Sequence, residues 1–373
     1  MLDRNVIISC ARYVAALLVS LNAGGEQPKK PDCVSYRAVF KFAKRHALAG
    51  ALWYLLEDEI TAFGDEELTA RFSRECELDY LKNNVQTQEF ASVCSAFGKA
   101  GIKHLPLKGF ISKALWKRPE YRSMTDMDIY VSPSDTDAAA EILLSLGYAE
   151  DHKSAEHDSY IKPPYVNIEL HKTLESYGIG DFSNWRAKEN APCFYELSDE
   201  DFLIFILMHM YKHYKAGGTG MRSFYDLHLF LGAKRGSLDL GYVRGELDKR
   251  GIGEFYSVAL RLSELWFLGR TECADELADF EYYIATGGTF GTVENRVEHA
   301  LTEKSRFRYT LSRIFLSYPK MKALYKWLGP LPFLLPVAWV IRLVAALFDG
   351  RLRRELRATS RAAKNESGEG EKL

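Results

Sequence analysis

Hydrophobic side chains recur at helical spacing along most of the chain. Near the N-terminus, apolar residues between positions 6 and 21 fall three or four apart, as on one face of an amphipathic helix. The same spacing over residues 78–97 predicts a long helix closed by Gly98 and Gly101, because glycine is common where helices end. The helical pattern returns at about residue 199 and continues to about 347.

The pattern changes between residues 101 and 175. IKHLPLK and TDMDIYV read as strands separated by the helix GFISKALW. SPSDTDAAAEILLSLGY then shows the Ser-Pro start, acidic first turn and glycine stop of a helix. Two more strands, SYIK and YVNIELH, are divided by Pro163-Pro164, which suits a hairpin turn. We therefore expect an α+β fold in which a small mixed β-sheet core is flanked by N-terminal helices and a C-terminal helical domain.

These patterns divide the chain into four segments. We expect an N-terminal helical region over 1–100, an α/β core over 101–175, a C-terminal helical domain over 176–350 and a charged tail over 351–373. The apolar segment 331–348 is interrupted by two prolines and contains an arginine, which is costly at a bilayer centre. We expect it to form a buried or partner-covered helix, and the sequence leaves open whether it contacts a membrane or a partner.

Charge and cysteine content narrow the class of protein. The chain carries 49 Lys and Arg against 50 Asp and Glu, a formal net charge of −1, so it lacks the global basic field of a non-specific nucleic-acid binder. Six cysteines occur without a CxxC pair, which disfavours a structural zinc site or a disulfide framework. Residues 13–25 loosely imitate a signal peptide, but Asp3 is acidic where such a peptide is basic. We expect a cytoplasmic protein without integral membrane insertion.

Two predicted strands carry ionisable groups opposite their apolar sides. Asp126 and Asp128 lie on one side of TDMDIYV, roughly 7 Å apart along the strand. Glu169 lies on the polar side of YVNIELH, beside His171. If these strands are neighbours, three carboxylates meet, a ligand set that suits Mg²⁺ or Mn²⁺. An exposed edge strand with solvated charges is the alternative for the aspartate pair taken alone.

The stretch LPLKGFISKALW precedes the aspartates. Its strand runs into Lys108-Gly109 and then a helix; glycine allows close approach to a phosphate, and a helix start offers free N–H groups. Lys108 and Arg122 add positive charge. A simple strand-to-helix turn is the competing interpretation.

Later motifs supply further candidates. HMYKH lacks the glutamate of a HExxH protease, so its residues either pack within the helical domain or let Lys212 or His213 reach the nucleotide or acceptor. In GGTGMRSFYD, Arg222 and Asp226 either meet the active-site side or form a structural pair.

LKGFISKALW, RSMTDMDIYV, LLSLGY, IELHKTL and GGTGMRSFYDLHLFL together resemble the polymerase-β-like nucleotidyltransferase superfamily, and more closely a poorly characterised bacterial nucleotidyltransferase family within it. The resemblance covers most of residues 75–345. The superfamily commonly has Gly-Ser or Gly-Gly where this chain has Lys108-Gly109, with a shorter gap to the aspartates.

The resemblance implies binding of an NTP with two divalent ions and transfer of a nucleoside monophosphate to a hydroxyl or phosphate acceptor. Asp126 and Asp128 would hold the metals, and Glu169 would share a metal and help to deprotonate the acceptor. The acceptor, whether a small molecule, a protein or RNA, is not specified. The nucleotide-binding candidates are Lys108, Gly109, Arg122, His171, Lys212, His213 and Arg222.

Two other functions compete. The DxD pair also occurs in sugar-nucleotide-dependent glycosyltransferases, although these normally have a longer domain of alternating strands and helices before it. A non-catalytic nucleotidyltransferase-like binding protein is the third possibility, which retention of all three carboxylates disfavours.

Overall fold

The structure is a computed structural model that describes residues 3–180, 182–183, 185–272, 274–297 and 316–348. It contains two compact units. The first unit comprises Met1–Lys212 and Gly220–Thr289, and the second comprises His213–Thr219 and Phe290–Leu373. The two units are described separately below.

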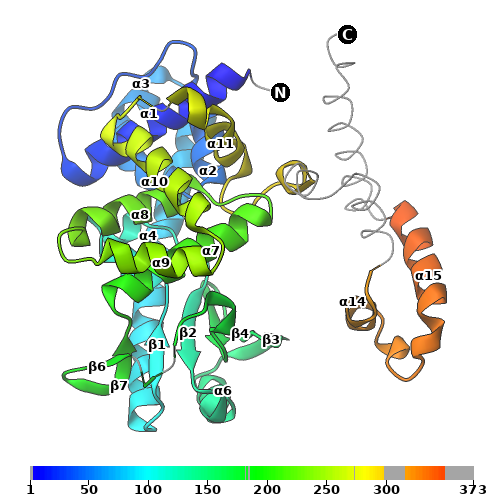
Figure 1. Cartoon of the computed structure of the whole chain (residues 1–373). Coiled ribbons are helices and arrows are strands. Elements are labelled where there is room, and N and C mark those ends of the chain that lie inside the picture. Colours follow the sequence, from blue (N-terminus) through cyan, green and yellow to red (C-terminus); the bar gives the residue numbers. More distant parts are fainter. Residues whose placement is uncertain (1–2, 181, 184, 273, 298–315, 349–373) are drawn as a thin grey trace. The chain divides into compact units, whose positions relative to one another are not determined.

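Helices form one end of the first unit and a β-sheet forms the other (Figure 1). The helices of this unit, with α7 continuing into the second, are α1 (Arg4–Ala23), α2 (Tyr36–Arg45), α3 (Ala49–Phe63), α4 (Glu66–Lys99), α5 (Gly109–Lys113), α6 (Thr136–Ser145), α7 (Asp199–Lys215), α8 (Met221–Lys234), α9 (Leu240–Lys249), α10 (Gly253–Leu268) and α11 (Ala274–Gly287). Helices α1, α2, α3, α10 and α11 gather at the end far from the sheet (Figure 1).

Helix α1 forms as the spacing of its apolar residues predicts. Asp3 caps its N-terminus by accepting a hydrogen bond from the backbone N–H of Asn5. Val14 and Leu17 on its apolar face are fully buried, and the helix contacts α2, α3, α10 and α11. Among the described residues it is the one helix long and apolar enough to cross a membrane, by length and composition alone. The cytoplasmic location stays a prediction.

Helix α4 joins the helical end to the sheet. It is 34 residues long, so the predicted helix is confirmed and starts earlier than its apolar spacing indicated. Val93 and Phe97 are fully buried, whereas Leu81, predicted on the same face, is 47% exposed. The Gln86 amide donates to the backbone carbonyl of Met124 at 3.1 Å. This hydrogen bond ties the helix to the segment that carries the aspartate pair.

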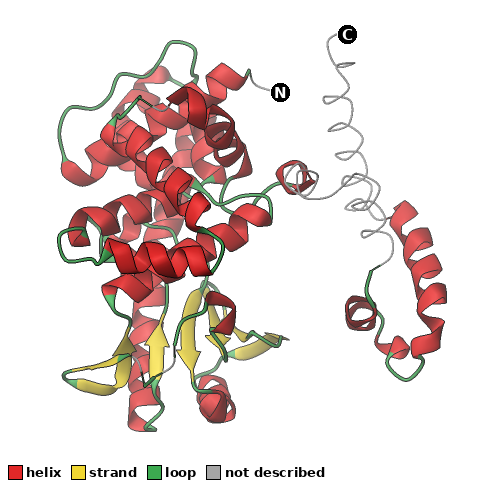
Figure 2. Ribbon diagram, viewed as in Figure 1, coloured by secondary structure: helices red, strands yellow, loops and turns green. Residues whose placement is uncertain are grey.

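The seven-stranded mixed sheet has the order β3-β4-β5-β2-β1-β7-β6 (Figure 2). Its strands are β1 (His104–Pro106), β2 (Met127–Val131), β3 (Ala149–Lys153), β4 (His157–Lys162), β5 (Val166–His171), β6 (Arg186–Lys188) and β7 (Ala191–Glu196). The central β2 pairs antiparallel with β1 and parallel with β5. The α+β fold class, the four predicted strands and the hairpin between β4 and β5 are confirmed.

The predicted end of the α/β core at residue 175 is too early. Strand β7 pairs parallel with β1, His104 lying opposite Phe194, and β6 pairs with β7. The sheet therefore extends to residue 196, and the helical pattern resumes only at α7. These two strands are short and mostly half-exposed or exposed, so they lack the hydrophobic alternation by which a strand is predicted from sequence.

The two faces of the sheet differ in chemistry. Ile129 of β2 and Ile168 of β5 are fully buried in a cluster that includes Val93 and Phe97 of α4 and Leu143 of α6. Helices α4 and α6 therefore cover the apolar face. Because strand side chains alternate, the polar side chains of β2 and β5 all lie on the opposite face.

The second unit contains α14 (Tyr318–Leu324) and α15 (Leu335–Phe348). Ala338 of α15 is buried in a small cluster with Met321 and Leu328. On the same helix Val340 and Val344 are 59% and 53% exposed. The predicted helix at 331–348 is thus present over most of its length. These two side chains are not buried within the chain, because α15 is apolar on more sides than its neighbours cover, and coverage by a partner stays a prediction.

Candidate active site

The predicted carboxylate cluster lies on the polar face of the central strands. The parallel register of β2 and β5 places Asp128 directly opposite Glu169. Asp126 immediately precedes β2, on the same side as Asp128 because strand side chains alternate. Asp128 is only 3% exposed, and the other two carboxylates are half-buried. The prediction that β2 and β5 are neighbours is confirmed.

Asp128 is held by two partners on one oxygen. The Lys108 ammonium lies 2.7 Å from its Oδ1 atom, and Nε2 of His171 lies 2.9 Å from the same atom. Since an ionised carboxylate only accepts, Nε2 of His171 carries the proton and donates it. Burial acts to raise the pKa of Asp128, but the Lys108 charge and the His171 contact outweigh it and lower that pKa. Asp128 is therefore an anion.

The other two carboxylates are less closely paired: Oε2 of Glu169 lies 3.7 Å from Nε2 of His171 and 3.9 Å from Nε2 of His157. Burial and the charge of Asp128 raise the pKa of Asp126. Burial, followed by the charges of Asp128 and Asp126, raises the pKa of Glu169 to about 7. Three carboxylates thus share one close lysine, and like charges this near each other need a cation or a proton between them. This donor set fits a divalent cation with a preference for oxygen ligands.

Lys108 takes an unusual backbone conformation at the turn between β1 and α5. Its φ is 42° and its ψ is −101°; a positive φ is uncommon for a non-glycine residue and stores backbone strain. A Cβ on Gly109 would clash with the Met124 side chain and lie 3.4 Å from Nη1 of Arg122. Glycine at this position therefore lets the turn pack closely on Met124. The following helix spans only Gly109–Lys113, shorter than the predicted GFISKALW.

Arg122 is already paired in this structure. Its Nε and Nη2 atoms donate to both oxygens of Asp226 on α8, at 2.8 to 3.0 Å. Asp226 also accepts from the indole N–H of Trp116 at 2.8 Å. The buried Arg–Asp pair considered for α8 thus exists, but its arginine is Arg122. Binding of phosphate by Arg122 stays a prediction. Nη1, which lies beside Gly109, is the Arg122 nitrogen that these hydrogen bonds to Asp226 leave for a phosphate.

Arg222 lies one turn before Asp226 on α8. Its Nη1 donates to the backbone carbonyl of Ser123. Within the described residues its Nε atom is buried without a hydrogen-bond partner. Burial and the Arg122 charge lower the pKa of Arg222 to about 10, while the charges of Asp226 and Asp126 oppose that shift. Arg222 therefore supplies positive charge on the Asp126 side of the cluster.

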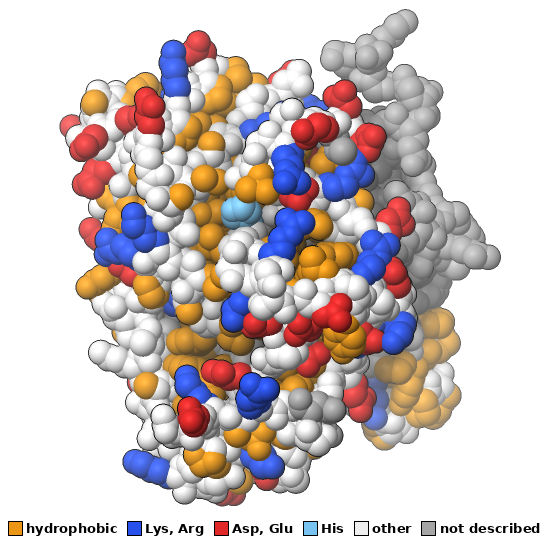
Figure 3. Space-filling model, turned by 60° about the vertical axis from the view of Figure 1, so that its left-hand side comes forward, with side chains coloured by type: hydrophobic (Ala, Val, Ile, Leu, Met, Phe, Trp, Pro, Cys, Tyr) orange, Lys and Arg blue, Asp and Glu red, His pale blue; other side chains and the backbone are white. Residues whose placement is uncertain are grey.

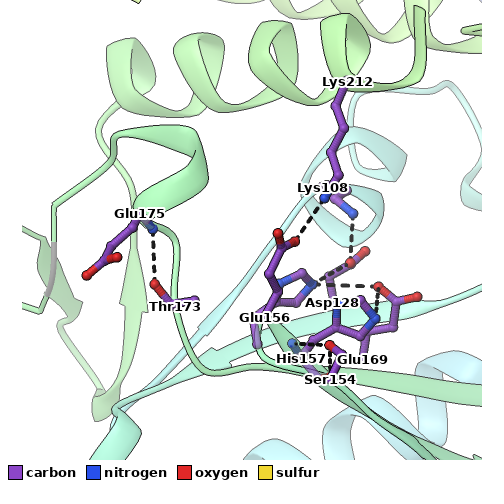
Figure 4. Close-up of polar contacts among 10 residues, drawn as sticks. Lys108, Asp128, Ser154, Glu156, His157, Glu169, Thr173, Glu175 and Lys212 are labelled. Atoms are coloured by element: carbon purple, nitrogen blue, oxygen red, sulfur yellow. Dashed lines mark hydrogen bonds and ion pairs between the residues drawn. The ribbon is translucent and has the colours of Figure 1, made fainter. Parts of the chain in front are cut away.

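Lys212 approaches the cluster from α7. In Figure 4 it points down from that helix toward Glu156, with Lys108 nearby, and its Nζ lies 3.0 Å from a Glu156 oxygen. Its exposed side chain leaves it accessible to a ligand. His213 follows it on α7 and groups with the second unit, so its predicted place beside the nucleotide stays a prediction.

His157 is the site residue that sequence reasoning missed. It lies at the start of β4 and directly faces His171 across the β4–β5 ladder. Its Nε2 is 3.9 Å from Glu169 Oε2. HDSYIK contains an acidic residue and a histidine at its start, but only the hairpin register shows which residue of β5 they face.

A cavity of about 760 Å³ lies beyond the carboxyl ends of β2 and β5. Tyr130, on the same face of β2 as Asp128, and Lys172, which follows β5, line it together with Lys103 and several hydroxyl side chains. Tyr130 packs edge-on against Trp185 and stacks on Phe182. The polar face of the sheet thus continues from the carboxylates to a chamber with mixed aromatic and polar walls.

A family model described as uncharacterised nucleotidyltransferase matches residues 32–268. The match contains the whole sheet and every predicted site residue, from Lys108 to Arg222. No curated protein and no solved structure matches the chain.

Proposed function

Because the chain belongs to the family described as uncharacterised nucleotidyltransferase, we propose that it transfers a nucleoside monophosphate from an NTP to a hydroxyl or phosphate acceptor with Mg²⁺ or Mn²⁺ as cofactor. The family match confirms the resemblance found in the sequence motifs. The identity of the acceptor and the dependence on metal are parts of the proposal.

One observation carries the proposal: three carboxylates from two adjacent strands converge on one face of the sheet beside a strained lysine. Asp128 faces Glu169, and the Lys108 ammonium contacts Asp128. A cluster that served only the fold would place opposite charges around each carboxylate. Here Asp126 and Glu169 repel Asp128, which favours a role in which a positive ligand arrives.

Each side chain then has a defined task. Asp126, Asp128 and Glu169 would hold the divalent ions, which stabilise the negative charge that develops at the reacting phosphate. Lys108 is placed to bind the phosphates of the NTP, with Lys212 above it. Glu169 would also help to take the acceptor proton. The acceptor oxygen bonds to the α-phosphorus, the bond from that phosphorus to the bridging oxygen breaks, and pyrophosphate leaves.

The cavity past β2 and β5 is our proposed acceptor chamber. It opens on the same sheet face as the carboxylates, and its wall combines Tyr130 with Lys103 and Lys172. On the face of the molecule drawn in Figure 3, basic and acidic side chains are interspersed. A small polar acceptor fits this setting better than a long RNA, which is bound through a continuous basic stripe.

The placement of the aspartates distinguishes this function from glycosyl transfer. From residue 3, where the described structure starts, only one strand, β1, precedes the aspartate-bearing β2. A glycosyltransferase that uses DxD would carry a larger set of alternating strands and helices ahead of it. Only a measurement of turnover distinguishes this function from that of a non-catalytic nucleotidyltransferase-like binding protein.

The test is incubation of the full chain with each labelled NTP and Mg²⁺ or Mn²⁺, together with mixed small molecules, RNA or protein as acceptor. We expect pyrophosphate release and label on one acceptor class. Matched samples of Asp126→Asn and Asp128→Asn should release pyrophosphate roughly 10³-fold more slowly. Transfer of a sugar from a sugar nucleotide without pyrophosphate, or NTP binding without turnover under every acceptor condition, contradicts the proposal.

A further inference from the structure

A second group of metal-ligating side chains overlaps the carboxylate cluster. His157 of β4 and His171 of β5 are directly opposed in the antiparallel ladder, and Glu169 lies two residues before His171 on the same face. Nε2 of His157 and Nε2 of His171 are 3.9 Å and 3.7 Å from Oε2 of Glu169. The ligand atoms of all three residues lie within 4.8 Å of one another. Figure 4 shows His157 and Glu169 turned toward each other.

These separations are close to those of a bound ion. Bonds of about 2.0–2.2 Å to nitrogen and carboxylate oxygen place the ligands of a tetrahedral ion about 3.3–3.6 Å apart. The two nitrogen-to-oxygen distances exceed this range by only a few tenths of an ångström. Small side-chain rotations, with the backbone ladder unchanged, would close the site around a cation.

The backbone around His157 is well anchored. Its N–H donates to the Ser154 hydroxyl at 3.0 Å, and that hydroxyl donates to the His157 carbonyl at 2.6 Å. In contrast, within the described residues the Nδ1 atom of His157 is buried without a hydrogen-bond partner. Nε2 of His157, on the other side of the ring, faces the Glu169 carboxylate at 3.9 Å, beyond hydrogen-bonding distance. A cation between the two atoms could bind both.

We propose that His157, Glu169 and His171 bind one transition-metal ion, of the class of Zn²⁺, Mn²⁺ or Co²⁺, beside the Asp126–Asp128 pair. Two imidazoles and a carboxylate suit these ions, whereas Mg²⁺ prefers oxygen ligands throughout. Binding at Nε2 of His171 replaces its hydrogen bond to Asp128, and the ring proton is then carried by Nδ1, so that the imidazole stays neutral. The inference rests on the proposed function only in sharing Glu169 with its metal site.

The test measures binding to the full-length, tag-free chain after removal of metals with a chelator. Titration with Co²⁺ should give one equivalent of tight binding with the visible absorption of a site that has nitrogen ligands. Excess Mg²⁺ should not displace it. His157→Ala should weaken Co²⁺ binding at least tenfold and change the spectrum. His157→Gln, which keeps a polar side chain, is a second variant should the alanine variant fail to fold.

His152→Ala is the matched control, since His152 is an exposed histidine on neighbouring β3 of the same sheet. It should bind Co²⁺ as the wild type does. Unchanged Co²⁺ affinity and spectrum in both folded His157 variants would overturn the proposal, as would displacement of Co²⁺ by equimolar Mg²⁺. Tight Co²⁺ binding without pyrophosphate release under any condition would contradict the transfer reaction and leave this metal site intact.

Discussion

At the scale of single residues, the two aspartates of DMD are chemically unlike. Asp128 is almost fully buried and contacts both Lys108 and His171. Asp126 has no such ion pair among the described residues, and its pKa is raised by burial and by Asp128. Repulsion between the two predicts that neutralising either one stabilises the metal-free protein. Because Lys108 and His171 already stabilise the charge of Asp128, we expect this gain in stability only when Asp126 is neutralised.

We therefore expect Asp128→Asn to lower the stability of the protein and Asp126→Asn not to lower it, whereas both variants should lose activity. Asp128→Asn leaves the Lys108 ammonium without its counter-charge, which should cost about 3 kcal/mol of unfolding free energy. Asp126→Asn should leave the metal-free protein as stable or more so. Either change should lower pyrophosphate release by roughly 10³-fold, the equivalent of about 4 kcal/mol of transition-state stabilisation. Urea unfolding and pyrophosphate assays check both.

Equal stability losses in the two variants would show that both aspartates serve the fold. Full activity in either folded variant would remove that residue from the metal site.

Glu169 should make the metal-free protein less stable as the pH rises toward neutral. Its pKa is raised from 4.5 in the unfolded chain to about 7 in the fold, first by burial and then by Asp128 and Asp126. The folded state therefore holds this proton more tightly, and stability falls as the pH passes from about 4.5 to about 7. Asp128, with a lowered pKa, changes stability only at lower pH.

Urea unfolding in chelator at pH 5.5 and at pH 7.5 measures this effect. The wild type should lose more stability between these values than Glu169→Gln, whose side chain does not titrate. Added divalent cation should reduce the loss in the wild type. Identical pH profiles for the two proteins would show that Glu169 is an ordinary solvated carboxylate.

At the scale of elements, the turn from β1 into α5 places Lys108 against Asp128. The positive φ of Lys108 and the close packing of Gly109 on Met124 make this turn sensitive to small changes. Gly109→Ala should cost about 1–3 kcal/mol of stability through overpacking and should weaken NTP binding by moving Lys108. Calorimetric titration with NTP and Mg²⁺, with thermal melting, checks both effects.

Gly98→Ala is the control, because no atom lies within 4 Å of the position its Cβ would take and Gly98 lies within α4. It should stabilise the protein by up to about 1 kcal/mol with NTP binding unchanged. NTP affinity as high in Gly109→Ala as in the control would separate the turn from the nucleotide site.

Among the strands, the sequence predicts which side chains share a face but not the register that brings residues of two strands together. Alternation within TDMDIYV and YVNIELH predicts which side chains share a face, because the period of two is local. The contact of Asp128 with Glu169 needed the further hypothesis that these strands are neighbours, which the register confirms. The facing of His157 and His171 depends on the β4–β5 register. A short strand rich in polar residues does not specify that register by itself.

Polar pairs between residues far apart in the chain cannot be predicted from local sequence patterns. Arg122 and Asp226 are 104 positions apart, and nothing in the spacing of either segment indicates that they meet. A structural pair of Arg222 with Asp226 is one of two alternatives that the sequence offers, and the structure pairs Asp226 with Arg122 instead. Packing of α8 against the segment before β2 decides the pairing instead.

At the scale of the whole molecule, the first unit extends beyond the family match of residues 32–268. Helix α1 precedes the match and α11 follows it, and the two helices contact each other. Their main polar link is Glu281, fully buried, which accepts two hydrogen bonds from Arg12 at 2.7 and 3.0 Å. The indole N–H of Trp266 on α10 donates to the same carboxylate at 2.7 Å. This carboxylate therefore joins three helices at the end of the unit far from the sheet.

Glu281→Ala should destabilise the first unit by about 2–3 kcal/mol, since it leaves the buried Trp266 N–H without an acceptor and removes the ion pair of Arg12, whose side chain is 41% exposed. Arg4→Ala is the matched control: it removes the other α1–α11 ion pair, in which Asp279 is 95% exposed, and should change stability by less than about 0.5 kcal/mol. Under conditions where both variants are folded, NTP affinity should equal that of the wild type, because the site lies on the sheet. Urea unfolding measures the stability of each variant, and calorimetry measures its NTP affinity.

Equal, small losses of stability in both variants would mean that α1 and α11 stabilise the unit through apolar contact alone. A loss of NTP affinity in folded Glu281→Ala would mean that the helical end also shapes the site.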